Sequence, residues 1–96
     1  MKYDYLIVGA GLYGAVVANE MNKKGKKCLV IDKRSHIAGN TYTENCDGIN
    51  IHKYGAHIFH TNDKGVYEYL SKFTKWNDFW HRVLSYVDGN LVPMPI

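Results

Sequence analysis

Three glycines near the start of the chain have the spacing of a phosphate-binding loop. Gly9, Gly11 and Gly14 follow a short apolar run in the pattern Gly-x-Gly-x-x-Gly. In such a loop the first glycine permits a tight turn, the second lets the backbone approach a pyrophosphate, and the third lets a helix pack closely on a strand. The phosphates then lie at a helix N-terminus, where free N–H groups and the helix dipole favour an anion.

A carboxylate follows at the distance expected for a nucleotide site. Asp32 lies 18 residues after Gly14, at the end of a second apolar run. An acid at this place accepts hydrogen bonds from the ribose hydroxyls of a dinucleotide. Because a carboxylate would repel a 2′-phosphate, Asp32 argues against NADP. The glycines and the acid together predict dinucleotide binding.

A strand–helix–strand unit is needed to hold these residues in place. Residues 3–8 and 27–31 are apolar runs that predict two buried strands, and residues 12–24 predict the helix between them. Such a unit has parallel strands. Asp47-Gly48 is a turn signal that predicts two short strands around it, as a β-hairpin. The expected fold class is α/β, a Rossmann-like unit with a parallel sheet and a hairpin extension.

Further elements are predicted in the second half of the chain. Asn62 is a candidate cap for a helix over residues 63–73, and residues 82–87 and 91–95 predict two strands joined at 88–90. The chain stops within the apolar run 91–96, so we expect residues 1–96 to be the N-terminal part of a larger, dinucleotide-binding domain.

Composition narrows the possible partners. The 96 residues carry a formal charge of +3, too little to indicate nucleic acid, and no apolar run is long enough for a membrane span. His52, His57 and His60 lack the cysteines or paired carboxylates that would complete a metal site, so no metal is expected. A cytoplasmic protein is the expectation.

The glycine loop alone does not distinguish FAD from NAD. Gly39-Asn40 follows Asp32 closely and would let the chain pass the pyrophosphate from its other side, which favours FAD. An FAD enzyme, a flavin oxidoreductase of the amine-oxidase type, an NAD-dependent dehydrogenase and a non-catalytic nucleotide-binding module all remain open at this point.

Two segments resemble one family of flavoenzymes. Residues 32–40 (DKRSHIAGN) and 52–61 (HKYGAHIFHT) are similar to UDP-galactopyranose mutases, and amine oxidases have no reason to keep the histidine-rich second segment. The resemblance implies an isomerase that interconverts UDP-galactopyranose and UDP-galactofuranose through an adduct between flavin N5 and the sugar, without net redox change. It implies reduced FAD as cofactor, UDP-galactose as substrate, a role in cell-surface polysaccharide synthesis, and a homodimer at full length.

The resemblance also implies roles for particular residues. His57 would lie on the flavin side as the catalytic candidate, and His81 and Arg82 would line the substrate pocket. Most of the active site would lie outside these 96 residues, so the chain alone is expected to be inactive. Departures from the family pattern are Asp32 where Glu is common, Ala38 where Gly is usual and Ala56 where Pro is common. The implied cofactor-binding residues are Gly9, Gly11, Leu12, Tyr13, Gly14, Asp32, Lys33, Arg34, Gly39, Asn40, Tyr54, Gly55, His57 and Ile58.

Overall fold

The computed structural model describes residues 1–80 and 82–94, which fall into two compact units. The first unit runs from Met1 to His57 and the second begins at Ile58. Each unit has a helix and an antiparallel hairpin of its own.

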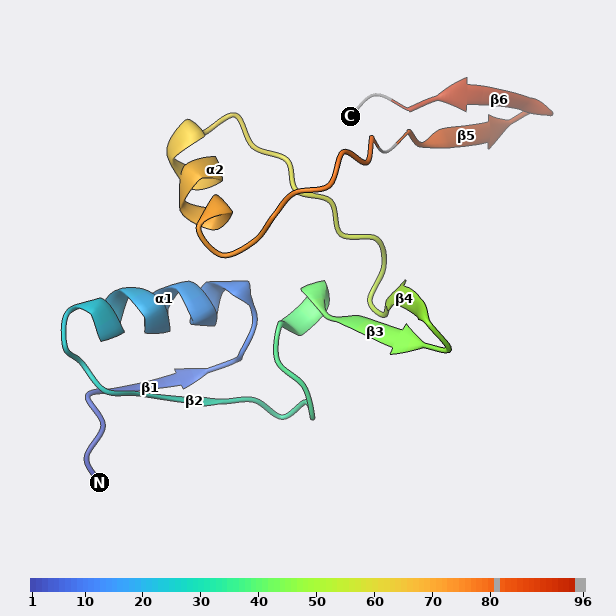
Figure 1. Cartoon of the computed structure of the whole chain (residues 1–96). Coiled ribbons are helices and arrows are strands. Elements are labelled where there is room, and N and C mark those ends of the chain that lie inside the picture. Colours follow the sequence, from blue (N-terminus) through green and yellow to red (C-terminus); the bar gives the residue numbers. More distant parts are fainter. Residues whose placement is uncertain (81, 95–96) are drawn as a thin grey trace. The chain divides into compact units, whose positions relative to one another are not determined.

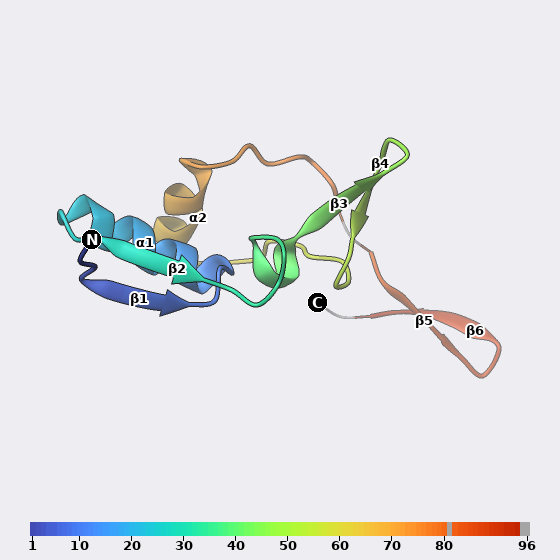
Figure 2. The same cartoon turned by 90° about the horizontal axis from the view of Figure 1, so that it is seen from below.

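The first unit opens with the predicted strand–helix–strand arrangement. Strand β1 (Tyr5–Val8) pairs in parallel with β2 (Cys28–Ile31), and helix α1 (Leu12–Lys23) connects them and contacts both (Figure 1). Figure 2 shows α1 along the same pair of strands from a second direction. The α/β fold class with a parallel sheet is therefore confirmed.

The two strands are not buried, contrary to expectation. Leu6 and Val8 are 61% and 76% exposed, and Gly14 is the one residue of the described chain that is buried. The physical reason is that α1 supplies cover for a two-stranded sheet from one side only. An apolar run on both faces of a strand signals a sheet covered on both faces, and the first unit contains no element for the second face.

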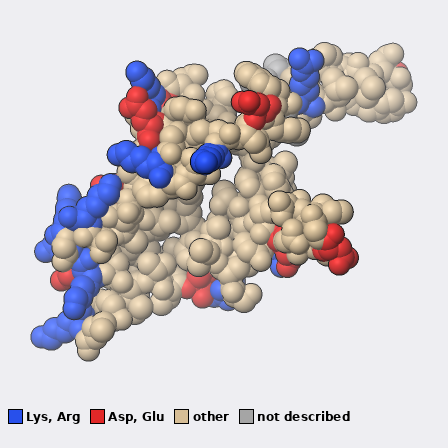
Figure 3. All heavy atoms as spheres, in the orientation of Figure 1, with Lys and Arg blue, Asp and Glu red and all other residues tan. Residues whose placement is uncertain are grey.

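Lysines gather where α1 ends. Gly25 adopts a left-handed φ of +75°, and its N–H donates to the Asn22 carbonyl, which closes the helix. Figure 3 shows blue Lys and Arg spheres gathered at this end of the first unit. Cations there complement the helix dipole. Because the phosphate loop lies at the opposite end of α1, these lysines are separate from it. The cluster comprises Lys23, Lys24, Lys26 and Lys27.

A short hairpin completes the first unit. The 3-10 helix Gly39–Thr41 leads into strands β3 (Thr43–Cys46) and β4 (Ile49–His52), which pair antiparallel. Asp47 and Gly48 both have positive φ, the conformation of a tight two-residue hairpin turn. The hairpin predicted around this turn is confirmed.

The second unit contains one helix and one hairpin. Helix α2 (Lys64–Ser71) is followed by β5 (Leu84–Val87) and β6 (Asn90–Pro93), joined through a positive-φ turn at Asp88 and Gly89. Trp76 stacks on Phe59 at 4.5 Å between ring centroids, which ties the chain on either side of α2 together. No helix among residues 1–80 and 82–94 has the length and hydropathy to cross a membrane.

Candidate dinucleotide-binding site

The N-terminus of α1 is open to an anion. Gly9 leaves β1 with φ +109°, and Gly11 is the N-cap residue, with no side-chain hydrogen bond to the first turn and no acidic residue in it. The first N–H groups of a helix have no partner inside the helix. This end of α1 therefore offers uncompensated donors to a phosphate.

Gly14 fixes the distance between α1 and β1. A Cβ atom built on Gly14 would overlap the carbonyl oxygen of Gly9 and lie 3.1 Å from Ile7 Cγ2. No larger residue fits here unless the helix moves away from the strand. The geometry agrees with the packing role predicted for the third glycine.

A second loop meets the phosphate loop at Gly39. A Cβ on Gly39 would lie 3.0 Å from the Gly11 Cα atom, so the two backbones approach with no side chain between them. The Ala38 N–H donates to the Ala10 carbonyl at 2.8 Å and holds the second loop in place. This glycine-lined cradle leaves room beside two backbones for a pyrophosphate, and the residues present fit a dinucleotide.

Ala38 stands in a conformation that favours glycine. Its φ is +77°, in the left-handed region, which costs an L residue with a Cβ about 1 kcal/mol. This conformation gives a physical reason for the glycine that is usual at this position in the family that the sequence resembles.

Asp32 braces the phosphate loop. Its Oδ2 accepts a hydrogen bond from the Ala10 N–H at 2.7 Å, and its Oδ1 accepts one from the Arg34 N–H at 2.8 Å. The hydrogen bond from Ala10, then that from Arg34, holds the pKa of the carboxyl below its ordinary value of 3.8. Sequence reasoning foresaw a ribose contact but missed this brace, because nothing in the spacing shows which N–H the carboxylate meets.

Lowering the pH should release this brace. Because the pKa of Asp32 is depressed in the folded chain, its contribution to loop order is present above about pH 4 and is lost as pH falls through the folded pKa. We expect the Ala10 and Arg34 amide signals in ¹⁵N NMR to move together between pH 6 and 2, with one midpoint below 3.8. Asp32→Asn should remove this titration, and a shared midpoint above 3.8 would contradict the brace.

An open pocket of about 310 Å³ lies beside Asp32. Its size and mixed lining suit a nucleoside. The residues that line it are Ala10, Val30, Asp32, Arg34, Ser35, His36 and Ile37.

Arg34 contacts two other predicted cofactor residues. The Arg34 guanidinium lies 4.1 Å from the Tyr54 ring centroid and donates to Asn40 Oδ1 at 3.0 Å. Sequence reasoning placed all three at the cofactor but did not foresee these contacts. Lys33, Leu12 and Tyr13 are exposed.

His57 carries a polar atom without a partner. Its ring stacks on that of His52 at 3.9 Å between ring centroids, and its backbone N–H donates to His52 Nδ1 at 3.2 Å. Its ring Nε2 lies 3.5 Å from Thr43 Oγ1. Its Nδ1 is buried and has no hydrogen-bond partner among the described residues. A buried polar atom of this kind is costly unless a ligand or water satisfies it.

The remaining predicted residues fall outside this cluster. Gly55 has φ +99° and follows β4, whereas Ile58 and Arg82 belong to the second unit. The predicted substrate residue His81 lies outside the described residues. Within residues 1–80 and 82–94, no group of three His, Cys, Asp or Glu side chains could hold a metal ion.

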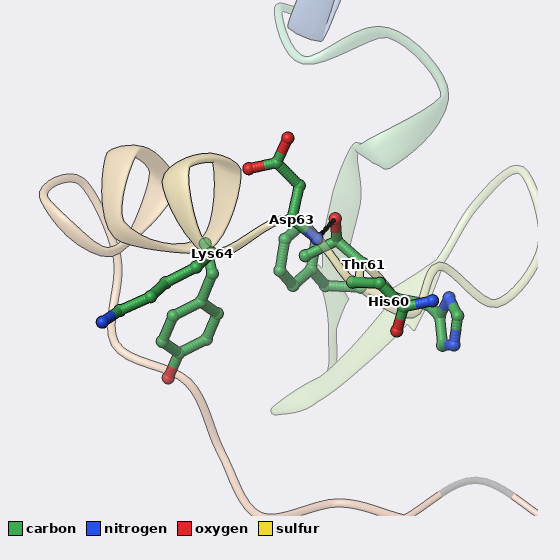
Figure 4. A pocket seen from close by; sticks show the side chains of 7 residues that line it. His60, Thr61, Asp63 and Lys64 are labelled. Atoms are coloured by element: carbon green, nitrogen blue, oxygen red, sulfur yellow. Dashed lines mark hydrogen bonds between the residues drawn. The ribbon is translucent and has the colours of Figure 1, made fainter.

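An open pocket of the second unit lies at the start of α2 (Figure 4). Thr61 Oγ1 accepts from the Asp63 N–H at 3.0 Å, and the Asp63 side chain accepts from Val66 N–H at 3.1 Å. The cap predicted at Asn62 is therefore wrong, because the neighbouring Asp63 makes this bond. The Lys64 and His60 side chains point away from each other. A carboxylate already occupies this helix end, in contrast to α1.

The strand–helix–strand fold and the phosphate loop between β1 and α1 define a dinucleotide-binding domain. The family model for NAD(P)-binding Rossmann-like domains matches residues 7–74, and the chain belongs to that family.

Curated relatives narrow the comparison. The chain is 42% identical over 92 residues to the UDP-galactopyranose mutase of Mycoplasma genitalium, covering 94% of this chain and 23% of the relative. It is 36% identical over 92 residues to that of Mycoplasma pneumoniae, with the same coverage. It is 36% identical over 93 residues to dTDP-fucopyranose mutase of Escherichia coli, covering 95% of this chain and 25% of the relative. The resemblance drawn from the sequence is confirmed, and the chain spans about a quarter of the length of these relatives.

Proposed function

We propose that the chain supplies the ADP-binding part of the FAD site in a mutase that interconverts UDP-galactopyranose and UDP-galactofuranose. The observation that carries the proposal is the 42% identity over 94% of the chain to a relative of that name. The whole active site needs the further length that the relatives have, so residues 1–96 alone are expected to be inactive.

FAD is the dinucleotide that we propose for the cradle. Two glycine-lined loops, at Gly11 and Gly39, approach each other, and a pyrophosphate between them is held from both sides. The acid Asp32 on the neighbouring strand disfavours a 2′-phosphate. The unsatisfied His57 Nδ1 lies on the segment that resembles the flavin side of the family.

Each part of the chain then has a task in the reaction. Reduced FAD supplies the nucleophile for the anomeric carbon, and the protein supplies position and electrostatics. The α1 N-terminus binds the pyrophosphate, Asp32 keeps the phosphate loop closed and meets the ribose, and His57 offers Nδ1 to the cofactor. The substrate-pocket roles of His81 and Arg82 are part of the proposal.

A dTDP-sugar is the second candidate substrate. The relative from Escherichia coli named dTDP-fucopyranose mutase is 36% identical over 95% of the chain. It differs from the proposed enzyme in nucleotide and sugar but shares the change of ring size, so the two candidates make different products from different donors.

We also propose a cytoplasmic enzyme that is a homodimer at full length and that serves galactofuranose-containing surface polysaccharides. Both cysteines of the chain, Cys28 and Cys46, are free thiols, which suits a reducing compartment.

A chimera tests the proposal. The aligned 92 residues of this chain replace the matching segment of the Mycoplasma genitalium relative. The purified protein is examined for the absorption spectrum of a bound flavin. It is then reduced with dithionite and given UDP-galactofuranose or dTDP-fucofuranose in turn, with pyranose formation followed by chromatography.

We expect a yellow chimera that converts the UDP-sugar only when reduced. Because about three quarters of this chimera come from the UDP-sugar enzyme, the second candidate is tested in a matching chimera with the Escherichia coli relative, and activity of that second chimera alone would move the assignment to it. A yellow chimera that converts neither sugar would leave an FAD site and overturn the mutase. A colourless chimera that binds NAD would overturn both.

A further inference from the structure

We propose that His36 is a positioning residue for the cofactor loops and that it sets FAD affinity through Tyr54. The inference rests on the proposed FAD site. The sequence pattern gave His36 no role in that site, and its place in an exposed loop suggested a solvated side chain.

His36 contacts two other parts of the first unit and the carbonyl group of its neighbour in sequence. Its ring stacks on Tyr42 at 3.8 Å with an interplanar angle of 12°. Its Nε2 lies 2.6 Å from the Tyr54 hydroxyl, and its Nδ1 lies 2.7 Å from the Ile37 carbonyl oxygen. A half-buried imidazole with a stacking partner and both nitrogens bonded is held in one orientation.

These partners fix the tautomer of the ring. A carbonyl oxygen can only accept, so Nδ1 carries the hydrogen and donates to Ile37. In the neutral ring Nε2 then accepts from the Tyr54 hydroxyl. Free histidine prefers the hydrogen on Nε2, so the Nδ1–H form is a spectroscopic signature of this arrangement.

Tyr54 connects His36 to two predicted cofactor-binding residues, Arg34 and Asn40. Its ring lies 4.1 Å from the Arg34 guanidinium, and Arg34 in turn donates to Asn40 Oδ1 at 3.0 Å. Asn40 follows Gly39, which lies against Gly11 of the phosphate loop. A fixed Tyr54 therefore keeps the second loop at the distance from Gly11 that the cradle needs.

His36 and Tyr54 should act as a coupled pair. His36→Phe keeps a ring for Tyr42 but loses both hydrogen bonds, and Tyr54→Phe keeps a ring for Arg34 but loses the hydroxyl. Because both variants remove the hydrogen bond between His36 and Tyr54, and one hydrogen bond contributes about 1 kcal/mol, we expect each variant to raise the FAD dissociation constant about fivefold. The double variant should exceed the larger single effect by less than twofold, which shows coupling in the cycle.

Two matched controls accompany the cycle. Tyr86→Phe removes a hydroxyl from a 75% exposed side chain, and His60→Phe replaces an exposed histidine of the second unit. Neither should change the FAD dissociation constant by more than twofold.

All the measurements use the chimera. The FAD dissociation constant is read from flavin fluorescence, kcat at saturating FAD from product formation, and the protonated ring nitrogen of His36 from ¹⁵N NMR. For His36→Phe, positioning predicts a weaker FAD affinity with kcat within twofold of the parent, and in the parent it predicts an Nδ1–H ring.

Each other result overturns the inference. If the FAD dissociation constant is unchanged in His36→Phe, His36 does not position the cofactor loops, although the FAD site itself remains. If the two effects add in the double variant, His36 does not act through Tyr54. An Nε2–H ring contradicts the Ile37 hydrogen bond. A parent chimera that binds no FAD overturns the proposed function itself, and this inference with it.

Discussion

Replacing Gly14 with alanine is expected to open the βαβ unit and abolish dinucleotide binding. The new Cβ atom would overlap the Gly9 carbonyl oxygen, which is backbone and cannot rotate away, and would press on Ile7. Overpacking at such a contact costs about 3 kcal/mol, a large share of the stability of so small a unit. Far-UV circular dichroism and FAD titration of the chimera should both report the loss.

Gly65→Ala is the matched control for this change. Gly65 lies in the first turn of α2, and a Cβ there would lie 3.2 Å from Asp63 Oδ1, which belongs to a side chain rather than to the backbone. Alanine inside a helix is favoured over glycine by up to about 1 kcal/mol, so the control should be neutral or slightly more stable. If Gly14→Ala melted and bound FAD as the control does, the close packing of α1 on β1 would be refuted.

The isolated 96-residue chain should associate with itself and bind apolar dyes. In β1 and β2, Leu6, Val8, Leu29, Val30 and Ile31 are between 38% and 76% exposed, on strands whose outer edges are unpaired within the first unit. Exposed apolar edge strands template pairing with other chains. We expect the fluorescence of anilinonaphthalene sulfonate to rise severalfold, and sedimentation to depend on concentration.

A lysine on the most exposed strand position tests the cause. Val8→Lys places a charge on β1 and should reduce both dye binding and association, whereas Val87→Lys, at a position that is 50% rather than 76% exposed, should change them less. A monomer at about 100 μM that leaves the dye dark would contradict the expectation.

Local signals predicted the elements well. The glycine spacing and the apolar runs indicated β1, α1 and β2 within two residues of their ends, and the Asp-Gly pairs marked both hairpin turns. These features depend on neighbours in sequence, which is why a single chain reveals them.

Contacts between distant residues were beyond the sequence. The bond from Ala10 to Asp32 spans 22 positions and that from His36 to Tyr54 spans 18, and neither has a periodic signal. Burial was misjudged for the same reason. The apolar run of β1 shows that cover is required, but the elements that provide it are set by tertiary packing rather than by the run itself.

The left-handed Ala38 has a consequence for how a ligand is received. The Ala38 N–H donates to the Ala10 carbonyl, and the Ala38 carbonyl accepts from the backbone N–H and the hydroxyl of Thr41. The three distances are 2.7 to 3.1 Å. The unfavourable torsion is thus imposed during folding, before any nucleotide arrives. Preorganisation of this kind leaves less conformational entropy to be lost on association. The strained torsion therefore lowers the stability of the folded chain and raises its affinity for the pyrophosphate.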